Sequence, residues 1–407
     1  MSYFEKTTFT PAASATDAFS RFRTSENYTI FDSKQIINNG VPLFWDHYSS
    51  SLVSSSFVYN STISSTIISV TGSQQAIRQS KQRMNYQPGK SQLVLMTGDL
   101  TSEPGVIKRI GYYESLGGTG SVSSGIYFER SGSDLYTCIS SNGSVHYKQS
   151  QSLWSLDRLD GGAINPSGYV NDSSKVQIYI FDFEWLGVGN IRFGRVIDGN
   201  IVYVDNHSHA NKESTVTMNM PNLPCRYEII GSTGSSGSMQ AICAAVQTEG
   251  GFQLNGVSRG ISTIHSGVTT TLNEMTPVVG IKFQPDKQYS SIEINEFVGT
   301  SALTNGQFAQ YSIVLNPVTS SNVTFNNIPN STLMEFTGST ASGQTITGGT
   351  VLKTVVMGNT ADQISSYVNT PLRLGSSILG KSDEIYLAVR ANTAATTVAS
   401  LNITEIL

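Results

Sequence analysis

The amino-acid sequence predicts an all-β protein with two antiparallel, jelly-roll-like β-sandwich domains behind an extended N-terminal arm. Apolar and polar residues alternate in many short runs, which is the period of a strand with one buried face. Gly, Asn and Pro separate these runs about every 8–12 residues, a spacing typical of sandwiches. Charged residues make up only 13% of the 407 residues, against roughly 25% in an ordinary globular protein.

The clearest pattern lies in the middle of the chain. Val176 to Trp185 alternates over ten positions with apolar side chains on both faces, which predicts a strand covered on both sides. Gly187 and Gly189 then predict a sharp bend before a second strand over Ile191 to Ile197. Asp198-Gly199-Asn200 tolerates positive φ angles, so we expect a reversal there into a third strand, Ile201 to Asp205.

The rest of the chain divides at two points. Residues 1–40 predict an arm, because they are polar, small and without a regular apolar period. Residues 41–250 predict one large β-sandwich. Its further strands are expected over 91–96, 106–113, 125–129, 135–140, 145–149, 215–220, 225–230 and 239–246.

Gly250 and Gly251 mark the boundary to a second sandwich over 251–407. Its strands are expected over 278–283, 291–298, 310–315, 332–336, 351–356, 384–390 and 399–407. A short helix is expected over Thr360 to Val368, because Ile364, Tyr367 and Val368 follow helical spacing.

Charge and composition exclude several classes of function. A net charge of −4 provides no basic surface for nucleic acid. No apolar stretch approaches the roughly 20 residues of a membrane-spanning helix, and no secretory signal follows Met1, so we expect synthesis in a cytoplasm. The three cysteines, Cys138, Cys225 and Cys243, lack metal-site spacing and predict free, buried thiols.

Several segments resemble virion structural proteins of tailed bacteriophages. They are Arg21 to Ser25 with Ile30 to Lys34, Tyr86 to Ser91, and Glu184 to Gly189 with Arg192 to Gly194. The resemblance covers roughly residues 20–250, and its order of motifs is more specific than any one motif. The order of strand, bend and hairpin also looks like a concanavalin-type lectin jelly roll, an analogy of fold alone.

The resemblance implies a non-enzymatic structural component of the virion, made in the host cytoplasm and placed on the head, neck or tail. Such a component acts by self-association, with a trimer expected, and by docking on other virion proteins. Arg21, Phe22, Arg23 and Phe31 are the candidate interface residues, because Arg and aromatic side chains are enriched in interface cores.

Two alternatives involve carbohydrate. Trp154 could stack on a sugar of the host surface, which would make the chain an adhesin or receptor-binding protein, although Trp in a sandwich more often packs in the core. Asp182 and Glu184 share one strand face, as the acid and nucleophile of a polysaccharide depolymerase would. The simpler interpretation pairs these carboxylates with Arg192 or Arg195, so we expect no catalytic residues.

Asp205, His207 and His209 alternate on one strand face and could together hold a divalent metal. They run into a polar loop, where solvated side chains are the simpler interpretation. The sequence therefore predicts no metal and no cofactor.

Overall fold

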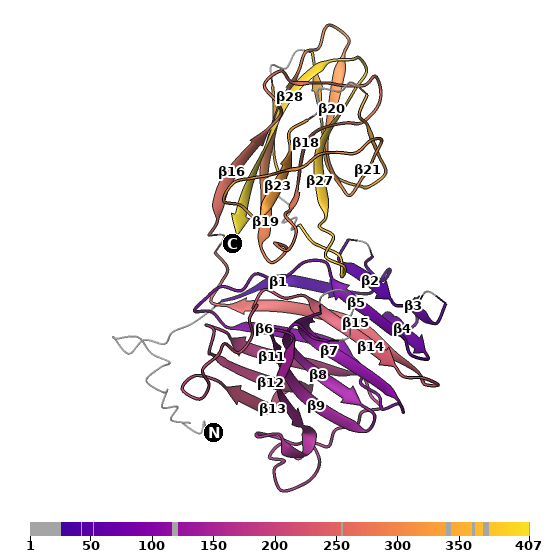
Figure 1. Cartoon of the computed structure of the whole chain (residues 1–407), viewed down its shortest axis with the longest axis vertical. Helices are drawn as coiled ribbons and strands as arrows, with labels where there is room; N and C mark the ends of the chain where they lie inside the picture. The colour runs from indigo at the N-terminus through magenta and orange to yellow at the C-terminus, as the bar shows by residue number, and fades with distance from the viewer. Residues whose placement is uncertain are drawn as a thin grey trace, which may run out of the picture.

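The computed structural model describes residues 26–406 apart from positions 42, 52, 116–120, 254, 339–342, 360–362 and 369–373. The expected all-β class is confirmed, since the named strands of the described residues all pair antiparallel and the short 3-10 helix η3 (Gln151–Leu153) adds one turn. Two β bodies follow one another along the long axis of the molecule (Figure 1). In the described part of the chain, no helix is long and apolar enough to cross a membrane.

The first body is a sandwich of two sheets. An eight-stranded sheet has the order β13-β12-β11-β6-β15-β4-β3, with β1 paired to β15, and a seven-stranded sheet has the order β10-β9-β8-β7-β14-β5-β2. The strands are β1 (Asn27–Lys34), β2 (Trp45–Ser49), β3 (Ser55–Asn60), β4 (Ser65–Thr71), β5 (Gln75–Ser80), β6 (Gln92–Gly98), β7 (Val106–Glu114), β8 (Ser124–Ser131), β9 (Asp134–Ser141), β10 (Ser144–Ser150), β11 (Gln177–Glu184), β12 (Asn190–Ile197), β13 (Asn200–Ser208), β14 (Cys225–Gly231) and β15 (Ser236–Glu249).

Aromatic side chains fill the space between these two sheets. Tyr179 and Phe181 point inward from β11, and both pack against Phe128 of the facing sheet, with ring centroids 5.3 and 5.5 Å away. Period-2 alternation makes this possible, because every second residue of a strand reaches the same face. Cys138 and Cys225 are free and buried in this body as expected, whereas Cys243 is only partly buried.

The bend between β11 and β12 depends on one glycine. Leu186 and Gly187 have φ angles of 38° and 80°, and the Gly189 amide donates to the Trp185 carbonyl at 2.7 Å. A Cβ atom at Gly189 would lie 1.6 Å from the Glu184 carbonyl oxygen, so no other residue fits this tight turn. The expected strand, bend and hairpin are therefore confirmed.

The expected arm is corrected at its C-terminal end. Asn27–Lys34 forms β1, which pairs with β15 from Glu249 back to Cys243. Ile30 and Phe31 point into the sandwich and are 8% and 6% exposed. A strand with only two inward apolar residues shows little apolar alternation in its sequence. Its stability comes from pairing with a strand that is distant in the chain.

The strand expected over 215–220 is also wrong. Its backbone bonds go to the bend instead: the Thr217 amide donates to the Gly187 carbonyl at 2.8 Å, and the Met218 carbonyl accepts from the Trp185 indole at 2.9 Å. These partners satisfy the segment without a neighbouring strand.

The second body also has two main sheets, of the orders β16-β28-β19-β26 with β17 on β28, and β22-β23-β18-β27-β20-β25; β21 and β24 form a small pair. Its strands are β16 (Val257–Ser262), β17 (Val268–Thr269), β18 (Thr276–Phe283), β19 (Ser291–Ser301), β20 (Phe308–Leu315), β21 (Val318–Thr319), β22 (Asn326–Asn327), β23 (Leu333–Phe336), β24 (Ile346–Thr347), β25 (Thr350–Gly358), β26 (Ile364–Tyr367), β27 (Glu384–Ala391) and β28 (Thr396–Ile406).

The helix expected over 360–368 is wrong in its described part. Ile364–Tyr367 is strand β26, paired with β19 through Gly299 opposite Ile364. Burial alternates along it, because Ile364 and Ser366 are partly buried while Ser365 and Tyr367 are exposed. A four-residue segment beside an open sheet edge forms its hydrogen bonds with that edge, which outweighs its weak helical spacing.

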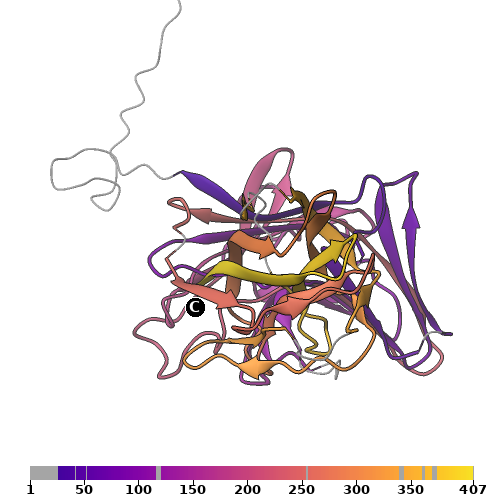
Figure 2. The same cartoon turned by 90° about the horizontal axis from the view of Figure 1, so that it is seen from above.

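A polar contact joins the two bodies, and Figure 2 shows the second body lying over the first. Asp383 forms an ion pair with Lys81, and both side chains are nearly buried. The Ile378 amide donates to Asp46 at 2.8 Å, and Tyr289 donates from its hydroxyl to Glu114 at 2.6 Å. A buried ion pair between elements needs defined geometry, so this contact orients the two sandwiches.

Candidate functional site

Three histidines converge at one open edge of the first sandwich. β10 is the edge strand of the seven-stranded sheet and β13 is the edge strand of the eight-stranded sheet. His146 lies on β10, His207 lies on β13, and His209 follows β13 directly. Their ligand nitrogens all lie within 4.8 Å of one another. The site therefore lies between the two sheets at this edge and takes side chains from both of them.

A β-bulge directs His146 toward the other two histidines. The register of β10 against β9 shifts between Val145 and Tyr147, so His146 is the additional residue without a partner. Bulges of this kind commonly reorient a side chain at a sheet edge. The result is a ring-centroid distance of 6.2 Å from His146 to His207 and 6.3 Å to His209.

The two histidines of the β13 side are buried and face each other. Nδ1 of His209 lies 3.4 Å from Nε2 of His207, and their side chains are 0% and 11% exposed. A turn after His209, in which the Glu213 amide donates to the His209 carbonyl at 3.3 Å, brings a carboxylate over the pair. The Glu213 oxygens lie 3.7 Å from His207 Nε2 and 3.8 Å from His209 Nδ1.

Burial and hydrogen bonding set the state of the two inner histidines. Desolvation lowers the pKa of His207 below the ordinary histidine value, so its imidazole is neutral at pH 7. The Thr215 carbonyl lies 2.5 Å from Nε2 of His209 and can only accept, so Nε2 carries the proton. Nδ1, the other ring nitrogen of His209, faces His207 and Glu213.

Asp205 does not join this cluster, although it alternates with the two histidines in sequence. Its side chain is 0% exposed and accepts hydrogen bonds from Thr137 at 2.6 Å, Tyr147 at 2.7 Å and the Ser155 hydroxyl at 2.9 Å. The Tyr147 ring in turn packs on His207 with centroids 4.6 Å apart. Asp205 thus holds the Tyr147 ring against the cluster. The cluster also contains His146 and Glu213, which the sequence analysis did not identify.

Asp182 and Glu184 lie on the outer face of β11, as their spacing predicts. Asp182 is 7% exposed, forms an ion pair with Arg192 and accepts a hydrogen bond from the Tyr203 hydroxyl. Burial and this carboxylate raise the pKa of Tyr203. The expected pairing with Arg192 is confirmed, whereas Arg195 lies over the Tyr179 ring at 4.0 Å.

Trp154 cannot act as a sugar-stacking platform. Its side chain is 0% exposed and packs edge-on against Phe128, with ring centroids 6.0 Å apart. Its indole donates to the Gln149 carbonyl at 3.3 Å. The candidate carbohydrate site at Trp154 is therefore corrected: the segment after η3 turns inward because a large indole stabilises the core more than it does a loop.

The candidate interface residues have different outcomes. Arg21, Phe22 and Arg23 lie outside the described residues. Phe31 belongs to the core, where its ring packs edge-on against Trp45 with centroids 5.9 Å apart. Its assignment to an interface is wrong, because β1 places it on the inward face.

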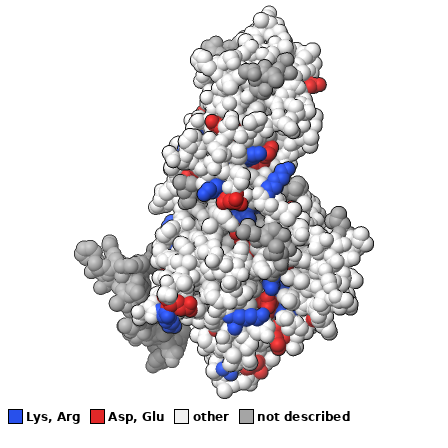
Figure 3. Space-filling view, in the orientation of Figure 1, with Lys and Arg blue, Asp and Glu red and all other residues white. Residues whose placement is uncertain are grey.

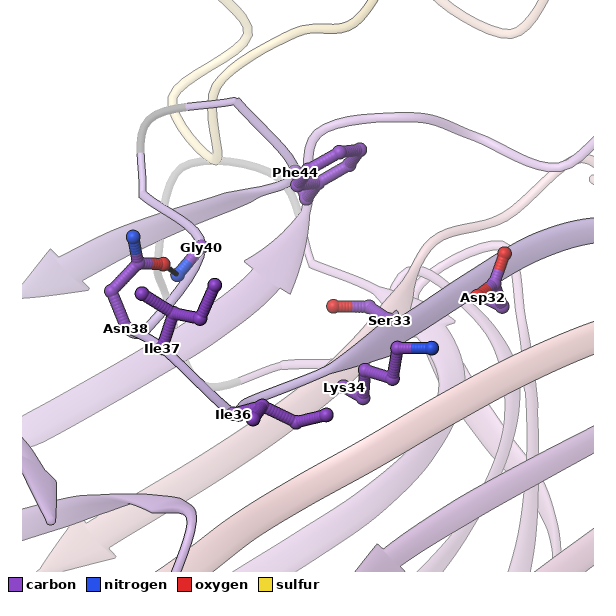
Figure 4. A pocket seen from close by; sticks show the side chains of 8 residues that line it. All are labelled: Asp32, Ser33, Lys34, Ile36, Ile37, Asn38, Gly40 and Phe44. Atoms are coloured by element: carbon purple, nitrogen blue, oxygen red, sulfur yellow. Dashed lines mark hydrogen bonds between the residues drawn. The ribbon is translucent and has the colours of Figure 1, made fainter. Parts of the chain in front are cut away.

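An apolar surface lies instead in the connection between β1 and β2. Ile36, Ile37 and Phe44 are 63%, 86% and 54% exposed, and they border a pocket of about 450 Å³. Figure 4 shows these side chains around the pocket, with Ile36 beside Lys34 at the end of β1 and with Ile37 and Phe44 across from that strand. Much of the surface in the view of Figure 3 carries no charge. Exposed apolar side chains grouped in this way are typical of a contact with another molecule.

Comparisons with known proteins give a likeness of fold only. No protein-family model matches the chain, and no curated protein matches it significantly. A protein of unknown function from Shewanella oneidensis MR-1 has a TM-score of 0.38 at 10% identity, covering 56% of this chain and 88% of that one. A CBM2 module of the evolved Dit of Lactobacillus casei BL23 phage J-1 has a TM-score of 0.36 at 6% identity, covering 57% and 100%. A Bacillus licheniformis β-glucanase has a TM-score of 0.33 at 12% identity, covering 57% of this chain and 100% of that one.

Proposed function

We propose that this chain is a non-enzymatic structural component of a tailed-phage particle that acts by self-association and by docking on other virion proteins. The exposed apolar surface of Ile36, Ile37 and Phe44 carries the proposal. A partner that covers it removes apolar area from water, which favours association. The choice of a phage particle rests on the ordered motifs between residues 20 and 250, which resemble virion structural proteins of tailed bacteriophages. Neither nucleic acid nor a membrane is a partner in this proposal.

The occupant of the pocket is the N-terminal segment of a neighbouring copy. That segment carries Phe22 between two arginines, Arg21 and Arg23. The pocket offers matching chemistry, with the apolar side chain of Phe44 on one side and the exposed carboxylate of Asp32 on the other. An aromatic anchor with flanking Arg contacts is the usual composition of an interface centre.

A neighbour's segment fits better than the chain's own. The segment enters β1 at Asn27, and the pocket borders the other end of that strand, at Lys34. Eight residues of strand span roughly 26 Å, so the chain's own Phe22 would have to reverse and run back along β1. A second copy needs no such reversal, and repetition of this contact around an axis closes a ring such as a trimer.

Sedimentation velocity of the purified full chain tests the proposal. We expect the wild-type chain to form an oligomer. The dissociation constant of this oligomer should rise at least about tenfold in Phe22→Ala and in Phe44→Ala, because each variant removes an aromatic anchor. Phe308→Ala is the matched control, since Phe308 is 50% exposed but lies on the second body. A monomeric wild-type chain at every concentration, or an equal effect of Phe308→Ala, would contradict the proposal.

Two further assays separate this function from the carbohydrate alternatives. Specific signals on a glycan array would favour an adhesin that binds host surface glycan. Release of reducing sugar from host polysaccharide, lost in Asp182→Asn, would favour a depolymerase. We expect neither, because Trp154 is buried and Asp182 is already bound to Arg192.

A further inference from the structure

We propose that His146, His207, His209 and Glu213 form a binding site for one divalent transition-metal ion, with Zn²⁺ as the best match. Three imidazole nitrogens within 4.8 Å of one another carry this inference, together with a carboxylate 3.7 and 3.8 Å from two of them. Three or four protein ligands of this type are the composition of zinc sites.

The spacing of the buried pair fits a tetrahedral metal. With Zn–N bonds of about 2.0–2.1 Å, two nitrogens on a tetrahedral ion lie roughly 3.3–3.4 Å apart. Nδ1 of His209 and Nε2 of His207 are separated by 3.4 Å. The exposed ligands, His146 and Glu213, lie somewhat farther away and sit on a bulge and a turn, so small side-chain rotations bring them to the ion.

The surroundings of the pair support ligation. The Nε2 proton of His209 is held by the Thr215 carbonyl at 2.5 Å, and this hydrogen bond leaves Nδ1 free to bind. Metal-binding histidines usually donate their second nitrogen to such an acceptor, which fixes the ring orientation. The Tyr147 ring, itself held by Asp205, packs on His207 and limits its rotation.

The donor set narrows the choice of ion. Ca²⁺ and Mg²⁺ prefer oxygen ligands, and Cu⁺ prefers sulfur, whereas imidazole with one carboxylate suits Zn²⁺, Co²⁺, Ni²⁺ and Cu²⁺. Four protein ligands leave no open position, so the site is structural in type.

Binding would join the two sheets of the first sandwich at their open edge. His146 belongs to the seven-stranded sheet through β10, whereas His207 belongs to the eight-stranded sheet through β13. An ion held only by the folded state raises its stability by mass action. We therefore expect Zn²⁺ to raise the melting temperature of the first sandwich.

Isothermal titration of the chelator-treated full chain with Zn²⁺ tests the site, and visible absorption with Co²⁺ reports its tetrahedral geometry. We expect one ion per chain. Loss of a group that only supports a metal ligand already weakens metal affinity roughly tenfold, so His146→Ala, which removes a ligand, should weaken Zn²⁺ affinity by at least that factor. His146 is exposed, so this variant should keep the fold, which tryptophan fluorescence checks.

His265→Ala is the matched control, because His265 is an exposed histidine of the second body. Unchanged affinity in this variant and weakened affinity in both His146→Ala and Glu213→Ala would support the site. No Zn²⁺ binding, or equal affinity of the wild type and His146→Ala, would overturn it. The readout is independent of oligomeric state, so failure here leaves the proposed self-association untouched.

Discussion

Replacement of Phe31 by alanine distinguishes a core strand from an assembly arm. The Phe31 side chain is 6% exposed and packs edge-on against Trp45, which is itself 1% exposed. Its strand, β1, pairs with β15 on one side of the sandwich, with Phe31 opposite Val246. The substitution therefore removes an aromatic ring from a packed core and leaves the strand in place.

The magnitude follows from this burial. A buried Phe→Ala change costs about 3–5 kcal/mol, and we expect the lower end because β1 can shift on its single neighbour to fill part of the space. A loss of about 3 kcal/mol lowers the melting temperature of a domain of this size by roughly 6–12 °C. Domains commonly have about 5–15 kcal/mol of stability, so Phe31→Ala should still fold at 25 °C.

Urea unfolding followed by tryptophan fluorescence measures this loss in the first sandwich alone. All three tryptophans of the chain, Trp45, Trp154 and Trp185, lie in that body. Phe44→Ala is the matched control, since Phe44 is 54% exposed and its loss should change the stability of the dilute chain by less than about 0.5 kcal/mol. Equal unfolding midpoints for the two variants would refute the placement of Phe31 in the core.

Two other predictions concern ionisable groups of the same body. Burial raises the pKa of the Cys138 thiol to about 12 and also raises the pKa of Cys225, so both should react with a thiol reagent only after denaturation, as mass spectrometry would show; a native disulfide at either would contradict this. Burial, reinforced by Arg78, lowers the pKa of His47 from 6.5 to about 3. On acidification, His47 therefore takes up its proton near pH 6.5 in the unfolded chain but only near pH 3 in the folded one. The free energy of unfolding should fall as the pH drops through this range, by up to about 1.4 kcal/mol per pH unit. Urea midpoints across this range should vary less in His47→Gln, and an identical pH profile in the variant would rule His47 out as the cause.

Local features of the sequence were sufficient for most of the strands and for several turns. The alternation in β11 predicts which side chains share a face, because this period is a property of the extended backbone itself. The hairpin between β12 and β13 follows from Asp198 and Gly199, whose φ angles are 50° and 77°. Both features depend on neighbours only a few residues apart, which is why they can be read without a structure.

The sequence by itself determined the all-β class, the position of most strands and the neutral character of much of the surface. Only the tertiary structure decided that Trp154 and Phe31 are buried, and that His146 meets His207 and His209. Alternation groups residues on a face but does not say whether another sheet covers that face. The histidines lie on edge strands of two different sheets, about 60 positions apart in the chain, and strand contacts over such separations follow from the stacking of the whole sandwich.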